Sequence, residues 1–267
     1  MEKILKGVVR FHETVTEEVR PMFARLVKEG QSPRALFITC ADSRIVPNQI
    51  TTTDPGDLFL LRNIGNLVPP YSVVSAGQAG SSVAAAVEYA LEYLKIPNII
   101  VCGHSDCGAM NAVRNFKKLP EGSHLRTWLS YAEQALSRLL EGKVLDDTLS
   151  TQNQLAQLNV LQQIAHLREY PIVQQKLQEG KVDLYAMFLD ILNAEVQIYH
   201  PGRNRFVRVD PPVVEELAYL RRVFASVPGV RMNLPDTEAF QLQIGHSNGV
   251  QAVVEENRKA AVSGNKK

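Results

Sequence analysis

Two cysteines and one histidine are spaced as the ligands of a metal ion would be. His104 and Cys107 lie three residues apart in CGHSDCG (102–108), and Cys40 lies in FITCADSRIVP (37–47). Thiolate sulfur and imidazole nitrogen are ligands that Zn²⁺ commonly takes in proteins. Three protein ligands leave the fourth tetrahedral position open, which is typical of catalytic rather than structural zinc sites. The sequence therefore predicts one zinc ion per subunit, bound by Cys40, His104 and Cys107.

Two other interpretations of these residues remain. A single cysteine is more often a small core residue, and the histidine could be a capping residue. Cys102 could replace Cys107 as a ligand, but it lies in the apolar run NIIVC (98–102), which favours a buried structural role. Asp106 lies between the two ligands of the loop. We interpret it as a loop or helix-start residue, because three ligands already satisfy an open site.

A carboxylate and a guanidinium follow Cys40 at intervals of two residues, as Asp42 and Arg44. A free carboxylate beside zinc would tend to bind the metal and close the site. Arg44 could prevent this by holding Asp42 in a bidentate ion pair, which also keeps the carboxylate charged. Asp42 could then accept a hydrogen bond from zinc-bound hydroxide and orient it. The alternative is an exposed salt bridge that contributes little energy.

Both metal motifs follow short apolar runs that read as strands buried on both faces. These runs are ALFIT (35–39) and NIIVC (98–102), and LFLLR (58–62) is a third. Because such runs alternate with helical patterns, we predict an α/β fold with a mostly parallel sheet flanked by helices. Ligand sites in these sheets lie beyond the carboxyl ends of the strands. The three ligands would converge if the strands ending near residues 40 and 102 are neighbours.

The remaining patterns divide the chain into three parts. We predict an N-terminal helical arm (1–30), a zinc-binding domain (31–212), and a C-terminal strand and helix extension with a mobile tail (213–267). Pro21 is expected to break or bend the arm. Further helices are expected at 76–95, 123–140, 150–170 and 213–226. Further strands are expected at 182–191, 195–200 and 205–209, the last two joined by the turn PGRN.

Composition excludes several classes of protein. The net charge is +1 and 21% of the residues are charged, so nothing indicates a nucleic-acid partner, and RNRFVR (203–208) reads as a hairpin edge. No apolar run approaches the roughly 20 residues that span a bilayer. We find no signal-peptide pattern, and three cysteines do not suggest a disulfide framework, so we expect a cytoplasmic protein.

Four stretches, taken in order, resemble the β-class carbonic anhydrases, most of all the bacterial and cyanobacterial branch that includes carboxysomal enzymes. They are CADSR (40–44), PGDLFLLRNIGNLVPPY (55–71), VEYAL (87–91) and CGHSDCGAM (102–110). The resemblance implies reversible hydration of CO₂ to bicarbonate and a proton by zinc-bound hydroxide. It places the family's zinc ligands on Cys40, His104 and Cys107, and its catalytic dyad on Asp42 and Arg44.

The same resemblance implies the residues that meet the substrate. It gives Gln31 as a bicarbonate contact, an apolar CO₂ pocket, and a backbone N–H from Gly108 near the substrate. The pocket residues would be Phe59, Ile64 and Tyr89. Phe37 stands where a bicarbonate-regulated subgroup has tryptophan, which favours the constitutively open subgroup. Some pocket residues would come from the partner subunit.

Partners are also expected from the resemblance. It implies a homodimer with exchanged N-terminal helices, with dimers often pairing into larger homo-oligomers. A carboxysomal enzyme could use residues 213–267 to bind a scaffold or shell protein. The alternative for this segment is a helix packed on the neighbouring subunit, followed by a disordered tail.

Two competing functions keep the same fold. One is hydrolysis of carbonyl sulfide or carbon disulfide, which would use the same residues. The other is an inactive scaffold protein that keeps zinc for folding. The Asp42–Arg44 dyad argues against the scaffold, because a structural metal does not need such a dyad.

The other histidines stand alone and read as surface or capping residues: His12, His124, His166, His200 and His246.

Overall fold

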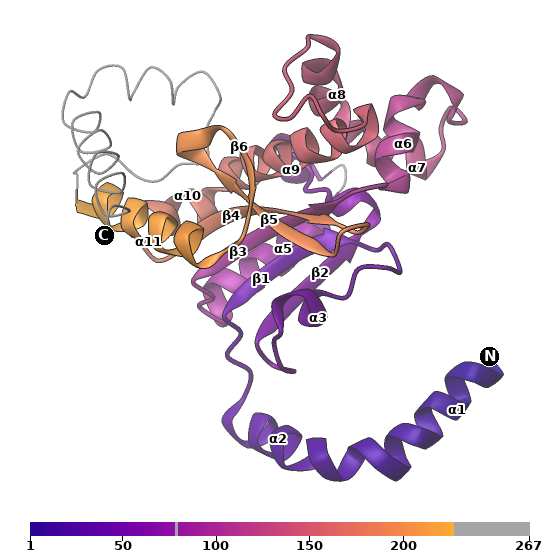
Figure 1. Cartoon of the computed structure of the whole chain (residues 1–267), viewed down its shortest axis with the longest axis vertical. Helices are drawn as coiled ribbons and strands as arrows, with labels where there is room; N and C mark the ends of the chain where they lie inside the picture. The colour runs from indigo at the N-terminus through magenta and orange to yellow at the C-terminus, as the bar shows by residue number, and fades with distance from the viewer. Residues whose placement is uncertain (78–79, 227–267) are drawn as a thin grey trace, which may run out of the picture.

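The computed structural model describes residues 1–77 and 80–226, and within these residues six strands form one sheet (Figure 1). The strand order is β2-β1-β3-β4-β5-β6. The first four strands in this order pair in parallel, and β5 and β6 add antiparallel neighbours. The bounds are β1 Ala35–Cys40, β2 Leu58–Asn63, β3 Asn98–His104, β4 Asp183–Asp190, β5 Glu195–His200 and β6 Arg205–Arg208. The predicted mostly parallel α/β fold is confirmed.

Helices flank this sheet and form the N-terminal arm. Their bounds are α1 Glu2–Arg10, α2 Thr16–Glu29, α3 Pro47–Thr51, α4 Tyr71–Ser75, α5 Ser81–Glu88, α6 Gly108–Arg114, α7 His124–Leu129, α8 Glu133–Leu140, α9 Thr151–Glu169, α10 Pro171–Gln178 and α11 Pro211–Ser226. Short π-helical segments follow α1 and α5, at Phe11–Val15 and Tyr89–Tyr93. Among the described residues, no helix is both long and apolar enough to cross a membrane.

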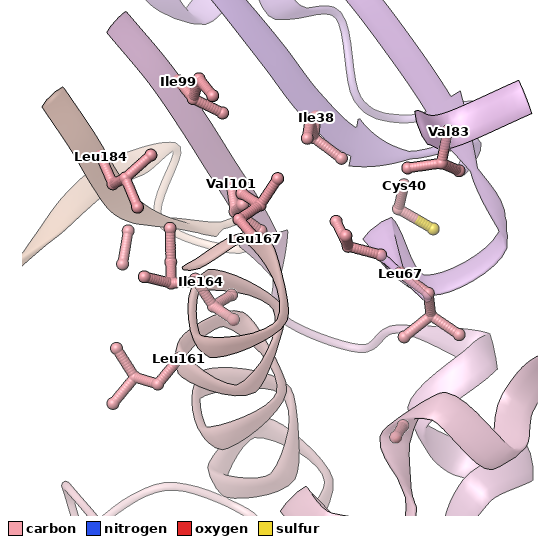
Figure 2. Packing of buried hydrophobic residues seen from close by; sticks show 14 of the residues in the cluster. Ile38, Cys40, Leu67, Val83, Ile99, Val101, Leu161, Ile164, Leu167 and Leu184 are labelled. Carbon is pink, nitrogen blue, oxygen red and sulfur yellow. The ribbon is translucent and has the colours of Figure 1, made fainter. Parts of the chain in front are cut away.

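The core forms because β1 is buried along its whole length and is covered by helices. All six residues of β1 are buried. Figure 2 shows Ile164 and Leu167 of α9 close to Val101 of β3, all three within one buried apolar cluster. At the carboxyl end of β1, Cys40 belongs to the same cluster as Leu67. The first cysteine of the predicted metal site therefore lies at the boundary between the core and the loops.

The N-terminal arm differs from its prediction at Pro21. Figure 1 shows a helical arm that extends away from the sheet, and helix α2 continues through Pro21 without a break. The arm departs from α-helical geometry earlier, at Phe11–Val15, where the Thr16 hydroxyl donates to the carbonyl of Phe11. A proline removes one backbone donor. On this exposed arm water can bind the carbonyl that loses its partner, so the helix tolerates Pro21.

Two of the predicted helices are shorter than expected. The stretch 76–95 becomes helical only at Ser81, after left-handed glycines at Gly77 and Gly80. A side chain at Gly80 would meet Pro69 at 2.6 Å, so this turn requires glycine. The stretch 123–140 is interrupted at Ser130–Ala132, between α7 and α8. Apolar spacing alone did not reveal this interruption because the residues on both sides of it continue to face the core.

Helix α9 packs very closely on β3, and Gly103 is the residue that permits this. A Cβ atom at Gly103 would lie 2.5 Å from Cγ2 of Val160 and 3.4 Å from the carbonyl oxygen of Ala156. We expect Gly103→Ala to lower the free energy of unfolding by about 1–3 kcal/mol, because the helix must move away from the strand. Urea unfolding measures this. Gly7→Ala is the matched control because the added Cβ would meet no atom within 4 Å, and equal stability of the two variants would contradict the prediction.

The chain beyond the parallel strands forms a hairpin and a helix, as predicted. Strands β5 and β6 are joined by the turn at Pro201–Arg203, and α11 follows directly. Helix α11 is held against the hairpin by the ion pair of Glu216 with Arg203, and Glu216 also lies 3.2 Å from Nε2 of His200. The predicted tail falls in 227–267, which lies outside the described residues.

Candidate metal centre

The fold brings Cys40, His104 and Cys107 together. Their ligand atoms all lie within 4.8 Å of one another, and each residue is at most 5% exposed. Cys40 ends β1, His104 ends β3, and Cys107 immediately precedes α6. Because β1 and β3 are parallel neighbours, their carboxyl ends meet at one edge of the sheet. The cluster has the donor set that suits a zinc ion.

The hydrogen bond of His104 leaves one ring nitrogen available for a metal. Nδ1 lies 2.8 Å from the carbonyl oxygen of Ser105. A carbonyl can only accept, so Nδ1 carries the proton and Nε2 has a free lone pair. Nε2 is buried and has no hydrogen-bond partner among the described residues. A buried acceptor without a partner is unfavourable, and a metal ion at the cluster would give it one.

The two thiols influence each other strongly. The hydrogen bond from the Cys107 thiol lowers the pKa of Cys40, aided by His104 and by the backbone N–H of Gly65, which lies 3.4 Å from the sulfur. The resulting Cys40 thiolate raises the pKa of Cys107, and burial raises it further. The pair alone therefore holds one negative charge. A divalent cation between the sulfurs would stabilise the second thiolate, so the donor set fits Zn²⁺.

Asp42 and Arg44 form a bidentate pair beside this cluster. Arg44 donates from Nε to Oδ1 at 2.9 Å and from Nη2 to Oδ2 at 2.8 Å, and its backbone N–H also donates to Oδ1. Oδ2 of Asp42 lies 3.9 Å from Nε2 of His104. The same guanidinium reaches the carbonyl of Asp106 at 3.1 Å. Arg44 thus ties the loop after β1 to the loop after β3.

The hydrogen bonds from Arg44 hold the pKa of the Asp42 carboxyl well below its usual range. We expect Arg44→Gln to raise this pKa toward the ordinary value of about 4. A depressed pKa stabilises the folded state above the unfolded-state pKa, and this stabilisation is lost as the pH falls through the folded-state pKa. The stability difference between wild type and variant should therefore shrink on acidification.

Carboxyl ¹³C chemical shifts measured against pH in the metal-free protein follow this titration directly. Arg34→Gln is the control, because Arg34 pairs with Asp57 instead of Asp42. An unchanged Asp42 titration in Arg44→Gln would show that another group depresses its pKa.

The structure also gives the surroundings of the predicted substrate-contacting residues. The rings of Phe59 and Tyr89 are 5.9 Å apart, and Ile64 directly precedes Gly65, whose N–H reaches Cys40. Gly108 begins α6, and a Cβ added there would meet no atom within 4 Å. Gln31 is exposed between α2 and β1, and none of the described hydrogen bonds joins it to the cluster.

Three residues outside the predictions hold the ligand loops. Arg62 donates to the carbonyls of Cys40 at 3.2 Å and of Asp42 at 2.8 Å. From α9, Gln152 donates to the carbonyl of Cys107, and Asn153 accepts from the N–H of Asp106. An arginine inside the apolar run LFLLR was the available signal for Arg62. The two α9 residues lie more than forty positions from the loop they hold, and nothing in the sequence links them to it.

The solitary histidines correct another expectation. His166 and His200 are 5% and 1% exposed, so they are not surface residues, and His200 makes no side-chain capping hydrogen bond although it stands at the N-cap position of Pro201–Arg203. His166 is fixed by the carbonyl of Val68 at 2.7 Å, a partner far away in the sequence. His12 and His124 are exposed, as expected, and His246 lies outside the described residues.

Cys102 is fully buried, which agrees with its predicted core role, and burial raises the pKa of its thiol to about 12.

Comparison with known proteins places this arrangement in a family. A family model described as carbonic anhydrase matches residues 35–196, which is more than half of the chain. A carbonic anhydrase of Synechococcus elongatus is 39% identical over 201 residues, covering 73% of this chain and 70% of the relative.

Solved structures agree with the sequence relatives. The β-carbonic anhydrase CcaA is 36% identical with a TM-score of 0.71, covering 79% of this chain and 92% of that one. Tetrameric β-carbonic anhydrases from Sordaria macrospora give 27% identity and a TM-score of 0.63, covering 74% and 97%. The chain therefore belongs to the β-carbonic anhydrase family.

Proposed function

We propose that this carbonic anhydrase hydrates CO₂ at a zinc ion held by Cys40, His104 and Cys107, with Asp42 and Arg44 as its catalytic dyad. Family membership and the curated relatives make the chain an enzyme that interconverts CO₂ and bicarbonate. The observation that carries the proposal is the buried Cys-His-Cys cluster with the ion-paired Asp42 beside it. Zinc, when bound, supplies a Lewis acid that makes a hydroxide nucleophile available near neutral pH.

The residues of the chain would perform the remaining tasks. Asp42 stays ionised because Arg44 occupies both of its oxygens, and this pairing also keeps the carboxylate off the cluster. Oδ2 accepts a single hydrogen bond from Arg44 and keeps a second lone pair, so Asp42 can accept a hydrogen bond from the nucleophile and orient it. Three protein ligands and a carboxylate held aside leave one coordination position for the reaction.

The substrate would meet a mostly apolar surface. Phe59, Ile64 and Tyr89 supply side chains that suit CO₂, and the backbone N–H of Gly108 would face the oxygen that becomes negative. Gly108 is the first residue of α6, so this N–H lies at a helix N-terminus, where no intrahelical carbonyl pairs with it. Gln31 would contact bicarbonate from the partner subunit, which accounts for its distance from the cluster of its own chain.

The proposed functional unit is a homodimer that exchanges N-terminal arms. The arm exposes apolar side chains that a single chain leaves in water: Ile4, Leu5, Val8, Val9, Phe23 and Val27. Burial of this surface against a second copy would be favourable. The fungal relatives described as tetrameric support a larger homo-oligomer built from such dimers.

Stopped-flow measurement of CO₂ hydration tests the proposal. The zinc-loaded protein should accelerate the reaction, and the same protein after chelation should not, until zinc is restored. A loaded, folded protein without activity would refute the proposal. The named relatives are carbonic anhydrases, so neither carbonyl sulfide hydrolysis nor the inactive scaffold gains support. Cytoplasmic or carboxysomal location and scaffold binding by 213–267 stay predictions.

A further inference from the structure

A single peptide unit separates Trp128 from the sulfur of Cys40. The indole Nε1–H of Trp128 donates to the carbonyl of Ile64 at 2.8 Å. The N–H of Gly65 belongs to the same peptide unit and points at Sγ of Cys40, 3.4 Å away. Indole, peptide and sulfur therefore form one chain of hydrogen bonds that ends on a predicted zinc ligand.

The backbone on the far side of this peptide is already fixed. Asn159 of α9 donates to the carbonyl of Gly65 at 3.0 Å, and both groups are buried. Asn63 exchanges two hydrogen bonds with the backbone of Leu67, each 2.8 Å long. Between these fixed residues, the carbonyl of the peptide that joins Ile64 and Gly65 takes its described hydrogen bond from Trp128.

The loop can adopt this shape only with glycine at its centre. Gly65 has a φ of +78°, and a Cβ there would lie 3.1 Å from the Cβ of Ala109. The left-handed backbone turns the Gly65 N–H inward, toward Cys40, while the Ile64 carbonyl faces Trp128. Trp128 is half-buried and is held edge-on against Tyr131, with ring centroids 5.5 Å apart. The indole donor is thus itself positioned by packing.

We propose that Trp128 is a positioning residue for the metal centre, acting through the Ile64–Gly65 peptide on the thiolate of Cys40. A donor on the carbonyl side polarises the peptide and makes its N–H a stronger donor to sulfur. Hydrogen bonds of this kind around a metal ligand commonly change metal affinity by about 10–100-fold. Trp128 contacts the ligand only through a peptide group, so we expect a change in metal affinity near the lower end of this range. This inference rests on the proposed zinc site.

The test compares two variants that each delete one hydrogen bond to the same loop. Trp128→Phe keeps an aromatic ring but loses the indole donor. Tyr170→Phe, the matched control, loses the bond from its hydroxyl to the carbonyl of Pro69 (2.9 Å), at the far end of the loop. Zinc affinity is measured by competition with a chromophoric chelator, and the thiolate-to-metal absorption band is recorded with cobalt in place of zinc.

Trp128→Phe should bind zinc about tenfold more weakly than wild type and shift the cobalt–thiolate band. Tyr170→Phe should match wild type in zinc affinity and in the cobalt–thiolate band, even if it lowers the midpoint of unfolding as much as Trp128→Phe does. Equal affinity and an unchanged band in Trp128→Phe would overturn the inference, as would equal losses in both variants.

A second substitution covers the case in which Trp128→Phe does not fold. Benzothienylalanine at position 128 replaces the indole N–H by sulfur and keeps the shape of the ring. The same loss of zinc affinity should follow, and wild-type affinity in this variant would overturn the inference. Failure of wild type itself to bind zinc would instead overturn the proposed zinc site.

Discussion

Cys40→Ser should contain almost no zinc when purified, whereas the wild type should contain about one zinc ion per chain. A serine hydroxyl does not ionise near neutral pH, so the substitution removes one of three anionic or imidazole donors. The remaining two ligands, His104 at the end of β3 and Cys107 in the turn after it, leave two tetrahedral positions open. Elemental analysis of the dialysed protein measures the loss. Activity should fall with the metal content.

Cys102→Ala is the matched control for this experiment. Cys102 is buried in β3, two residues before His104, but it is absent from the cluster of ligand atoms. The control protein should keep about one zinc ion per chain, even if the smaller side chain lowers stability. Full zinc retention in Cys40→Ser, or zinc loss only in Cys102→Ala, would show that the ligands have been assigned wrongly.

Asp42→Ala should keep its zinc and lose most of its activity. Asp42 is held by Arg44 and is not one of the three ligand residues, so the cluster remains intact. Loss of the acceptor that orients the nucleophile should lower kcat/KM for CO₂ hydration by about 10²- to 10³-fold, in the range of positioned acid–base groups. Stopped-flow rates normalised to the zinc content measure this effect separately from metal loss.

A carboxylate in the opposite loop provides the control. Asp106 has a left-handed backbone with φ of +55°, and asparagine tolerates that conformation well. Asp106→Asn should therefore fold normally and retain activity within a few-fold of wild type. If Asp42→Ala were as active as this control, the role proposed for Asp42 would be wrong.

The strands of this protein could be predicted closely from its sequence. ALFIT, LFLLR and NIIVC became β1, β2 and β3 with nearly the expected bounds, because short apolar runs between turns are typical of strands in such sheets. The prediction that LFLLR is buried on both faces is wrong: β2 is an edge strand without a buried residue, and Leu60 is 42% exposed. The helices were less predictable. The hydroxyl of Thr16 and the left-handed Gly80 decide where helical geometry changes or begins, and both effects depend on local hydrogen bonding and packing rather than on apolar spacing.

For the site, residue types that suit zinc could be recognised, and adjacency of β1 and β3 then brought them together. The residues that hold the loops could not be recognised. Gln152, Asn159 and Trp128 reach the loops from helices that lie far away in the chain. Their amide and indole groups look like ordinary helix residues until the tertiary structure shows their partners. Buried His166 was misjudged for the same reason.

The division of the ligands between β1 and the loop after β3 also bears on how the chain assembles. About sixty residues separate Cys40 from His104, so a bound metal would act as a removable cross-link between the parallel strands β1 and β3. Such a link can close only after both strands have been synthesised and paired, since the first ligand alone binds weakly. Metal capture would then hold the carboxyl ends of β1 and β3 together in the register that their hydrogen bonds already set.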